Sequence, residues 1–111
     1  MIYNTIDAEI IPERVPLDLD SYYFALEACA DAHMWREARG LLHLQTVRVA
    51  EEGGPKPDAL VYNLVLRAHL NGLKDGSRAS LDDVLEAMAV AGEPIDDALL
   101  GIPWGAVRGL L

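Results

Sequence analysis

The residues best suited to metal chemistry are Cys29 and His33, a thiol and an imidazole four positions apart. In a helix this spacing places both side chains on one face, as two metal ligands require. A zinc site needs three or four ligands, however, and His43 and His69 fall in other predicted helices. Cys29 is also the single cysteine, which excludes a multi-cysteine zinc site. We therefore predict no metal site, and interpret the pair as a small buried cysteine beside an interface histidine.

Paired acidic residues and glycine-containing turns are the other candidates for catalysis or cofactor binding. Neighbouring residues on a helix point in different directions, so the acidic pairs lack the arrangement of a two-metal or acid–base site. The turns lack the Lys and Ser/Thr of a phosphate-binding loop, and acidic surroundings disfavour a reactive thiolate at Cys29. The pairs are Glu51-Glu52, Asp82-Asp83 and Asp96-Asp97, and the turns are Gly53-Gly54 and Asn71-Gly72. We predict no catalytic residue and no cofactor, and expect that the chain is not an enzyme.

The length and net charge of the chain exclude further classes of function. The chain has 111 residues, 51% of them hydrophobic, which suits one small domain or a short repeat array. Its net charge of −9 would repel a nucleic-acid backbone unless the nine basic residues gathered on one face, and in the sequence they are scattered. The longest apolar stretch, 98–111, is too short to cross a bilayer and contains Pro103 and Arg108. RNA is therefore disfavoured as a partner, and no membrane span is predicted.

An internal repeat organises the chain. Residues 18–28 align with 58–68, pairing Asp18 with Asp58 and Tyr22 with Tyr62, and residues 36–42 align with 79–85. Three boundaries, each a proline followed closely by an aspartate, occur at residues 18, 58 and 96. This spacing predicts a repeat of about forty residues.

Each repeat has the pattern of two helices. Apolar residues recur at helical spacing after position 20, from Met34 to about Ala50, after Asp58, and from about Ala79 to Ala91. Asp20 or Ser21 is a candidate N-cap of the first helix, and Asp58 of the third. Gly53-Gly54 and Gly92, each followed by a proline, end the second helix of a repeat. The predicted fold is all-α, an α-solenoid of stacked helix-turn-helix hairpins.

The boundaries divide the chain into two complete units and two partial ones. Residues 1–18 form an N-terminal remnant or arm, 19–58 the first repeat, 59–96 the second, and 97–111 an apolar partial third repeat or docking tail. Because such arrays need about three repeats to cover their apolar faces, either the chain is part of something longer or a partner covers its ends.

With these features, the sequence resembles the pentatricopeptide-repeat family over roughly residues 14–100. The second unit carries the likeness in 57–66, which is similar to the family's opening helix, and in 81–88 and 92–96, which are similar to its second helix and boundary. Residues 35–42 of the first unit look like a variant of algal and other protist members. Tetratricopeptide repeats are the nearest rival, but the boundary pattern and spacing fit them less well.

The resemblance implies single-stranded RNA binding in a mitochondrion or chloroplast, with one base read per repeat. It places the base-reading side chains at Asn63 and Asp96, a pair that implies uracil, and at Tyr23 and Asp58 in the first unit. Asn63 and Asp96 are equally ordinary capping residues, and Tyr23 is equally a packing residue. Two repeats would engage about two bases, too few for stable recognition.

The C-terminal stretch is the candidate docking surface for a partner protein, since exposed apolar patches with an aromatic anchor usually meet a partner. Its apolar residues are Leu99, Leu100, Ile102, Trp104, Val107 and Leu110. We therefore expect a non-catalytic interaction or scaffold subunit docked in a larger organellar assembly, although residues 1–13 do not resemble a targeting segment. The alternative is a fragment of a single-stranded RNA-binding protein of organellar RNA metabolism.

Overall fold

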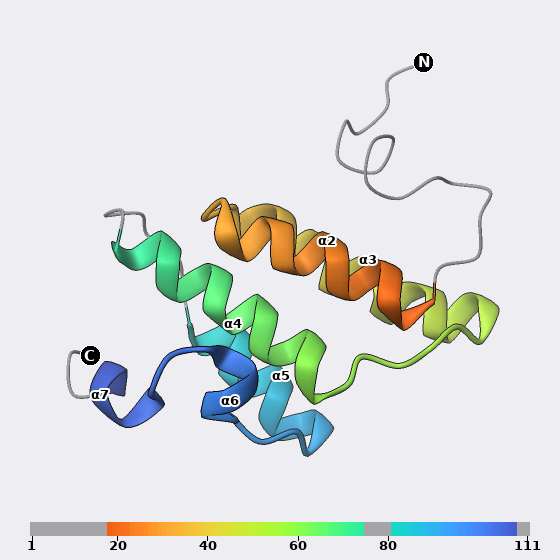
Figure 1. Cartoon of the computed structure of the whole chain (residues 1–111). Coiled ribbons are helices and arrows are strands. Elements are labelled where there is room, and N and C mark those ends of the chain that lie inside the picture. Colours follow the sequence, from red (N-terminus) through yellow and green to blue (C-terminus); the bar gives the residue numbers. More distant parts are fainter. Residues whose placement is uncertain (1–17, 75–80, 109–111) are drawn as a thin grey trace.

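A computed structural model describes residues 18–74 and 81–108 of the chain. In these two ranges all regular structure is helical, which confirms the predicted all-α class. Two long hairpins are followed by two short helices (Figure 1).

The first hairpin consists of α2 (Leu19–Asp31) and α3 (Trp35–Glu52). Oδ1 of Asp18 accepts hydrogen bonds from the backbone N–H and the hydroxyl of Ser21, each 2.9 Å long. The cap is therefore Asp18 rather than Asp20 or Ser21, because a capping oxygen bonds the amide three positions ahead. The chain turns at His33, whose φ is 59°. It leaves α3 through Gly53 in the left-handed conformation that glycine adopts without strain.

The second hairpin consists of α4 (Ala59–Lys74) and α5 (Asp82–Ala91). Asp58 caps α4 as predicted, with Oδ1 accepting from the backbone N–H of Val61 at 3.0 Å. The predicted start of α5 at about residue 79 lies outside the described residues, and its end at Gly92 agrees with the prediction. Two short helices follow, α6 (Asp97–Leu100) and α7 (Trp104–Arg108).

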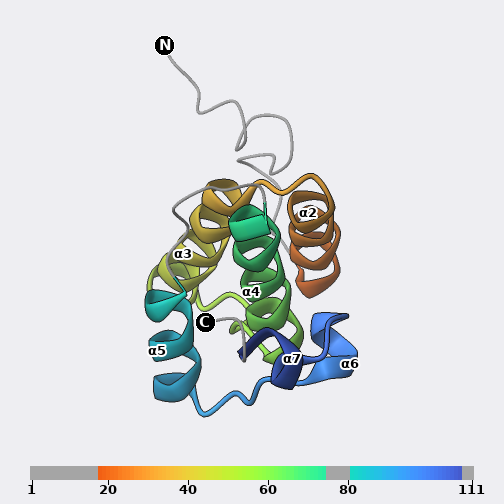
Figure 2. The same ribbon diagram turned by 90° about the vertical axis from the view of Figure 1, so that its left-hand side faces the viewer.

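Helix α4 is the centre of the structure. It packs against α2, α3, α5 and α6, and Figure 2 shows it with α2 and α6 on one side and α3 and α5 on the other. Every residue from 61 to 66 is buried, and each fully buried large apolar side chain stabilises the fold by roughly 1.5–3 kcal/mol. Helices α3 and α5 pack less closely against each other than either packs against α4. That difference leaves a hollow between them.

Polar side chains inside the core are held mainly by backbone carbonyls. Nε2 of Gln45 donates to the carbonyl of Pro55 at 3.0 Å, and Nδ2 of Asn71 donates to that of Ala30 at 2.9 Å. Nδ1 of His69 lies 2.8 Å from the carbonyl of Val65, and its ring lies 5.2 Å from the ring of Trp35. Nε2 of His69 has no hydrogen-bond partner within the described part of the chain. Because this nitrogen is buried, protonation of His69 would place a charge inside the core, which makes the fold sensitive to it.

Candidate functional site

The first predicted reader pair, Tyr23 and Asp58, meets between α2 and the loop before α4. The phenol of Tyr23 donates a hydrogen bond to Oδ2 of Asp58, while Oδ1 of the same carboxylate caps α4. This bond to Asp58 raises the pKa of Tyr23 to about 12, because it stabilises the protonated phenol. Asp58 therefore joins the two hairpins.

The second predicted pair, Asn63 and Asp96, meets at the end of the second unit. Nδ2 of Asn63 donates to the carbonyls of Ala59 at 2.7 Å and Pro94 at 3.2 Å. Oδ1 of Asn63 accepts from the backbone N–H of Asp96 at 3.0 Å, and the Asp96 carboxylate accepts from the backbone N–H of Ala98 at 2.9 Å. The Asn63 side chain is fully buried, and both its donor and its acceptor groups are in use.

The structure thus brings each predicted pair together, at equivalent positions of the two units. Tyr23 and Asn63 lie 40 residues apart, and each contacts the aspartate that closes its own unit. A base could reach Asn63 only if the helix boundary opened and these bonds broke. Base reading by these residues stays a prediction, and the geometry gives them a role in holding the units together.

Among the residues that the structure describes, two ion pairs link helices that are distant in sequence. Arg67 of α4 pairs with Asp31 at the end of α2, and Arg39 of α3 pairs with Asp83 of α5. A third arginine, Arg36, stacks over the ring of Trp35. Sequence reasoning missed both pairs, because charges 36 and 44 positions apart carry no local signal. These arginines contact groups of the chain itself instead of forming one basic surface.

The predicted docking tail is partly core. Leu100 is fully buried, and α6, which carries it, packs on α4. Leu99, Ile102 and Trp104 are half-buried, so part of each side chain stays open to a partner. The side chain of Val107 and all of Leu110 lie outside the described residues.

Cys29 and His33 do not share a helix face, contrary to their predicted placement. Helix α2 ends at Asp31, and His33 lies in the turn beyond it with a positive φ. Cys29 is fully buried, and burial raises the pKa of its thiol, with a smaller contribution from the charge of Glu37. Within the described ranges no group of three or more His, Cys, Asp or Glu side chains is placed to hold a metal ion.

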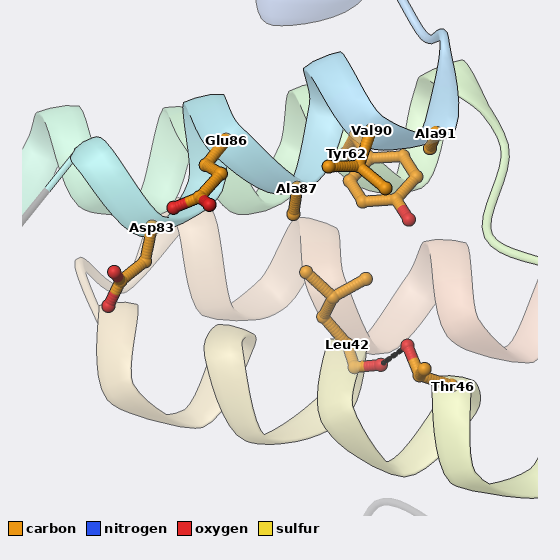
Figure 3. Close-up of a pocket in the computed structure, with 8 residues that line it drawn as sticks. All are labelled: Leu42, Thr46, Tyr62, Asp83, Glu86, Ala87, Val90 and Ala91. Carbon is orange, nitrogen blue, oxygen red and sulfur yellow. Dashed lines mark hydrogen bonds between the residues drawn. The ribbon is translucent and has the colours of Figure 1, made fainter.

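A hollow lies between α3 and α5, and the sequence did not indicate it (Figure 3). It has a volume of about 410 Å³ and adjoins a second hollow of about 660 Å³ towards the loop before α4. Tyr62 lines both parts, and Val90 stands beside them with 83% of its surface exposed. We call the two hollows together the α3–α5 groove. Its lining residues are Leu42, Thr46, Val49, Ala50, Lys56, Pro57, Asp58, Tyr62, Asp83, Glu86, Ala87, Val90, Ala91 and Glu93.

Comparison with protein-family models, curated proteins and solved structures finds no match to this chain. Among the helices that the structure describes, none is long and apolar enough to span a membrane.

Proposed function

We propose that this chain is a non-catalytic interaction subunit built from pentatricopeptide-like hairpins and held in a larger protein assembly. The observation that carries the proposal is the equivalence of the two unit boundaries. Tyr23 contacts Asp58, and Asn63 contacts Asp96, at corresponding places in successive hairpins. Corresponding contacts at a fixed period are typical of repeat arrays, whose extended surfaces usually serve binding.

The packing of the helices supports the same proposal. Helix α4 contacts the first hairpin through α2 and α3, its own partner α5, and the following helix α6. A solenoid needs this succession, in which the first helix of each unit packs on the unit before it. Helix α6 would then open a third unit, and the exposed parts of Ile102 and Trp104 would face the next element or a partner.

The net charge of the chain, and the bonds that its arginines and Asn63 already make within it, favour a protein partner over RNA. The net charge of −9 opposes binding to phosphates, and Arg39 and Arg67 are paired with carboxylates of the chain itself. Asn63 uses its amide to hold the boundary. An organellar location rests on the family resemblance alone and belongs to the same proposal.

Single-stranded RNA binding is the second candidate function, and one observation favours it. Phe24 follows Tyr23 on α2 and has 77% of its surface exposed, which is unusual for a large aromatic residue. An exposed aromatic ring is a typical stacking platform for an unpaired base.

One experiment separates the two functions. The native protein would be isolated from its source cells with and without RNase, at low and raised salt, and everything bound would be identified by mass spectrometry. A fixed set of proteins that survives RNase and raised salt supports the interaction subunit. Loss of every partner on RNase treatment, with a uracil-containing RNA recovered, would overturn it in favour of the second candidate.

A further inference from the structure

The α3–α5 groove has an apolar interior. The side chains of Leu42 from α3 and Ala87 from α5 face each other across it, and the ring of Tyr62 lies behind them (Figure 3). Val90 stands at its edge, almost fully exposed. An exposed aliphatic side chain beside an apolar hollow is typical of a surface that binds another chain.

The rim of the groove is acidic. Asp83, Glu86 and Glu93 line it along α5 and beyond, and among its described lining residues Lys56 is the single basic one. Asp83 is paired with Arg39, whereas the exposed Glu86 stands midway along α5. Glu93 acts on the groove too, since its charge adds to burial in raising the pKa of Tyr62. An apolar floor with an acidic rim selects a ligand with an apolar stripe and basic flanks.

We propose that the α3–α5 groove binds an amphipathic helix with Lys or Arg along its flanks, supplied by a partner protein. The inference rests on the proposed function as an interaction subunit and names the chemistry of the partner. A helix is the fitting occupant because the groove runs between two helices, where a third helix can lay its apolar face against both. The basic flanks complement Glu86 and Glu93 and speed association with this acidic chain.

The dimensions of α5 set the length of the bound helix. Its ten residues span about 15 Å, so a partner helix of about three turns would contact its whole length. Apolar anchors are then expected at positions i, i+3 or i+4, and i+7 of the partner.

The test is a selection from a displayed library of helical peptides of about 14 residues, a length that covers α5. The anchor positions carry apolar residues, and all of the remaining positions are Ala, Gln, Glu or Lys. Purified chain is the bait, and the dissociation constant (Kd) of enriched peptides is then measured by fluorescence anisotropy. We expect enrichment of peptides with lysine flanks, and a Kd that rises with ionic strength because the charged flanks are exposed.

Two groove variants are each matched by a control on α2. Val90→Ser should weaken binding of the enriched peptides about fivefold, because an apolar contact is lost. Glu86→Gln should weaken it about threefold and reduce the salt dependence. The controls Phe24→Ser and Glu27→Gln change an exposed aromatic and an exposed glutamate on α2, and should leave Kd unchanged. All four positions are exposed, so the variants should fold.

The proposal would be overturned by enrichment of glutamate-flanked peptides, by no enrichment at all, or by binding that Val90→Ser leaves intact. Self-association lost in Val90→Ser would also overturn it, by making a second copy of this chain the occupant. Single-stranded RNA that displaces the peptides, and whose binding the groove variants weaken equally, would also overturn the proposal in favour of a nucleic acid. If proteins survive RNase in the native isolation while no peptide is enriched, the groove proposal fails and the interaction subunit stands.

Discussion

The backbone N–H of Asp96 donates a hydrogen bond to Oδ1 of Asn63, 3.0 Å away, and the donor group of the same Asn63 amide bonds the carbonyls of Ala59 and Pro94. One buried side chain thus joins α4 to the boundary that precedes α6. The corresponding position of the first unit is Tyr23, which reaches Asp58 by its phenol. Two different side chains perform the same joining role at the same place in successive hairpins.

Asn63→Ala should destabilise the fold by about 2–4 kcal/mol, because three hydrogen bonds of a fully buried side chain are lost. The measurement is urea unfolding followed by circular dichroism. Asn71→Ala is the matched control, since its half-buried amide makes one such bond, to the carbonyl of Ala30, and should cost about 1 kcal/mol. Equal losses in the two variants would contradict the joining role of Asn63.

Tyr23→Phe should lower the free energy of unfolding by about 1 kcal/mol near neutral pH, because the bond to Asp58 is lost. The pKa of Tyr23 is raised to about 12 by that bond, from an ordinary value of 10.0. The unfolded chain therefore releases the phenolic proton first as the pH rises. The stability from this bond is fully present below about pH 10 and is lost as the pH approaches about 12.

Urea unfolding of both proteins across that pH window provides the check. Tyr22 and Tyr62 also have pKa values raised by burial, so the difference between wild type and Tyr23→Phe is the quantity to follow. That difference should shrink as the pH rises, and a constant difference would contradict the contribution of Tyr23.

The helices were predictable because their signals are local. Apolar spacing, the Asp58 cap and the left-handed glycines at Gly53 and Gly92 each act within about one helical turn. The first cap was misassigned because Asp18 and Asp20 are both acidic and precede the same apolar pattern. Only the geometry reveals that Asp18 reaches the amide of Ser21.

The sites were less predictable because they depend on contacts between units. The family resemblance implied Asn63 and Asp96 as a pair, but the burial of Asn63 depends on how α4 packs against its neighbours. The α3–α5 groove arises because these two helices pack mainly on α4 and little on each other. No single helix carries a signal for such a space.

His69 should make the fold sensitive to mild acid. Burial lowers the pKa of His69 from 6.5, and the positive charge of Arg39 acts in the same direction, against the bond to Val65 and the charge of Asp83. Since the unfolded chain then binds the proton more readily, stability is present above about pH 6.5 and is lost as the pH falls towards the lowered pKa.

His69→Leu removes this titration by putting an apolar side chain of similar size in place of the imidazole. Its free energy of unfolding should change less between about pH 6.5 and 5 than that of the wild type. His43→Gln is the control, because it replaces an exposed histidine of α3 and leaves His69 in place. If His69→Leu retains the full acid sensitivity, another group is responsible.

Cys29 offers a direct measure of whether the two hairpins unfold together. Its thiol is fully buried in α2 and its pKa is raised, so an aromatic disulfide reagent should react with it far more slowly in the folded chain than in concentrated urea. If the thiol reacts only after the whole chain unfolds, the labelling rate follows the free energy of unfolding.

Asn63→Ala lies in the other hairpin. The loss of unfolding free energy expected for this variant should then speed labelling by at least about 30-fold. Phe24→Ala, an exposed change on the same helix as Cys29, should leave the rate unchanged. Faster labelling in Tyr23→Phe but not in Asn63→Ala would show instead that the first hairpin opens alone.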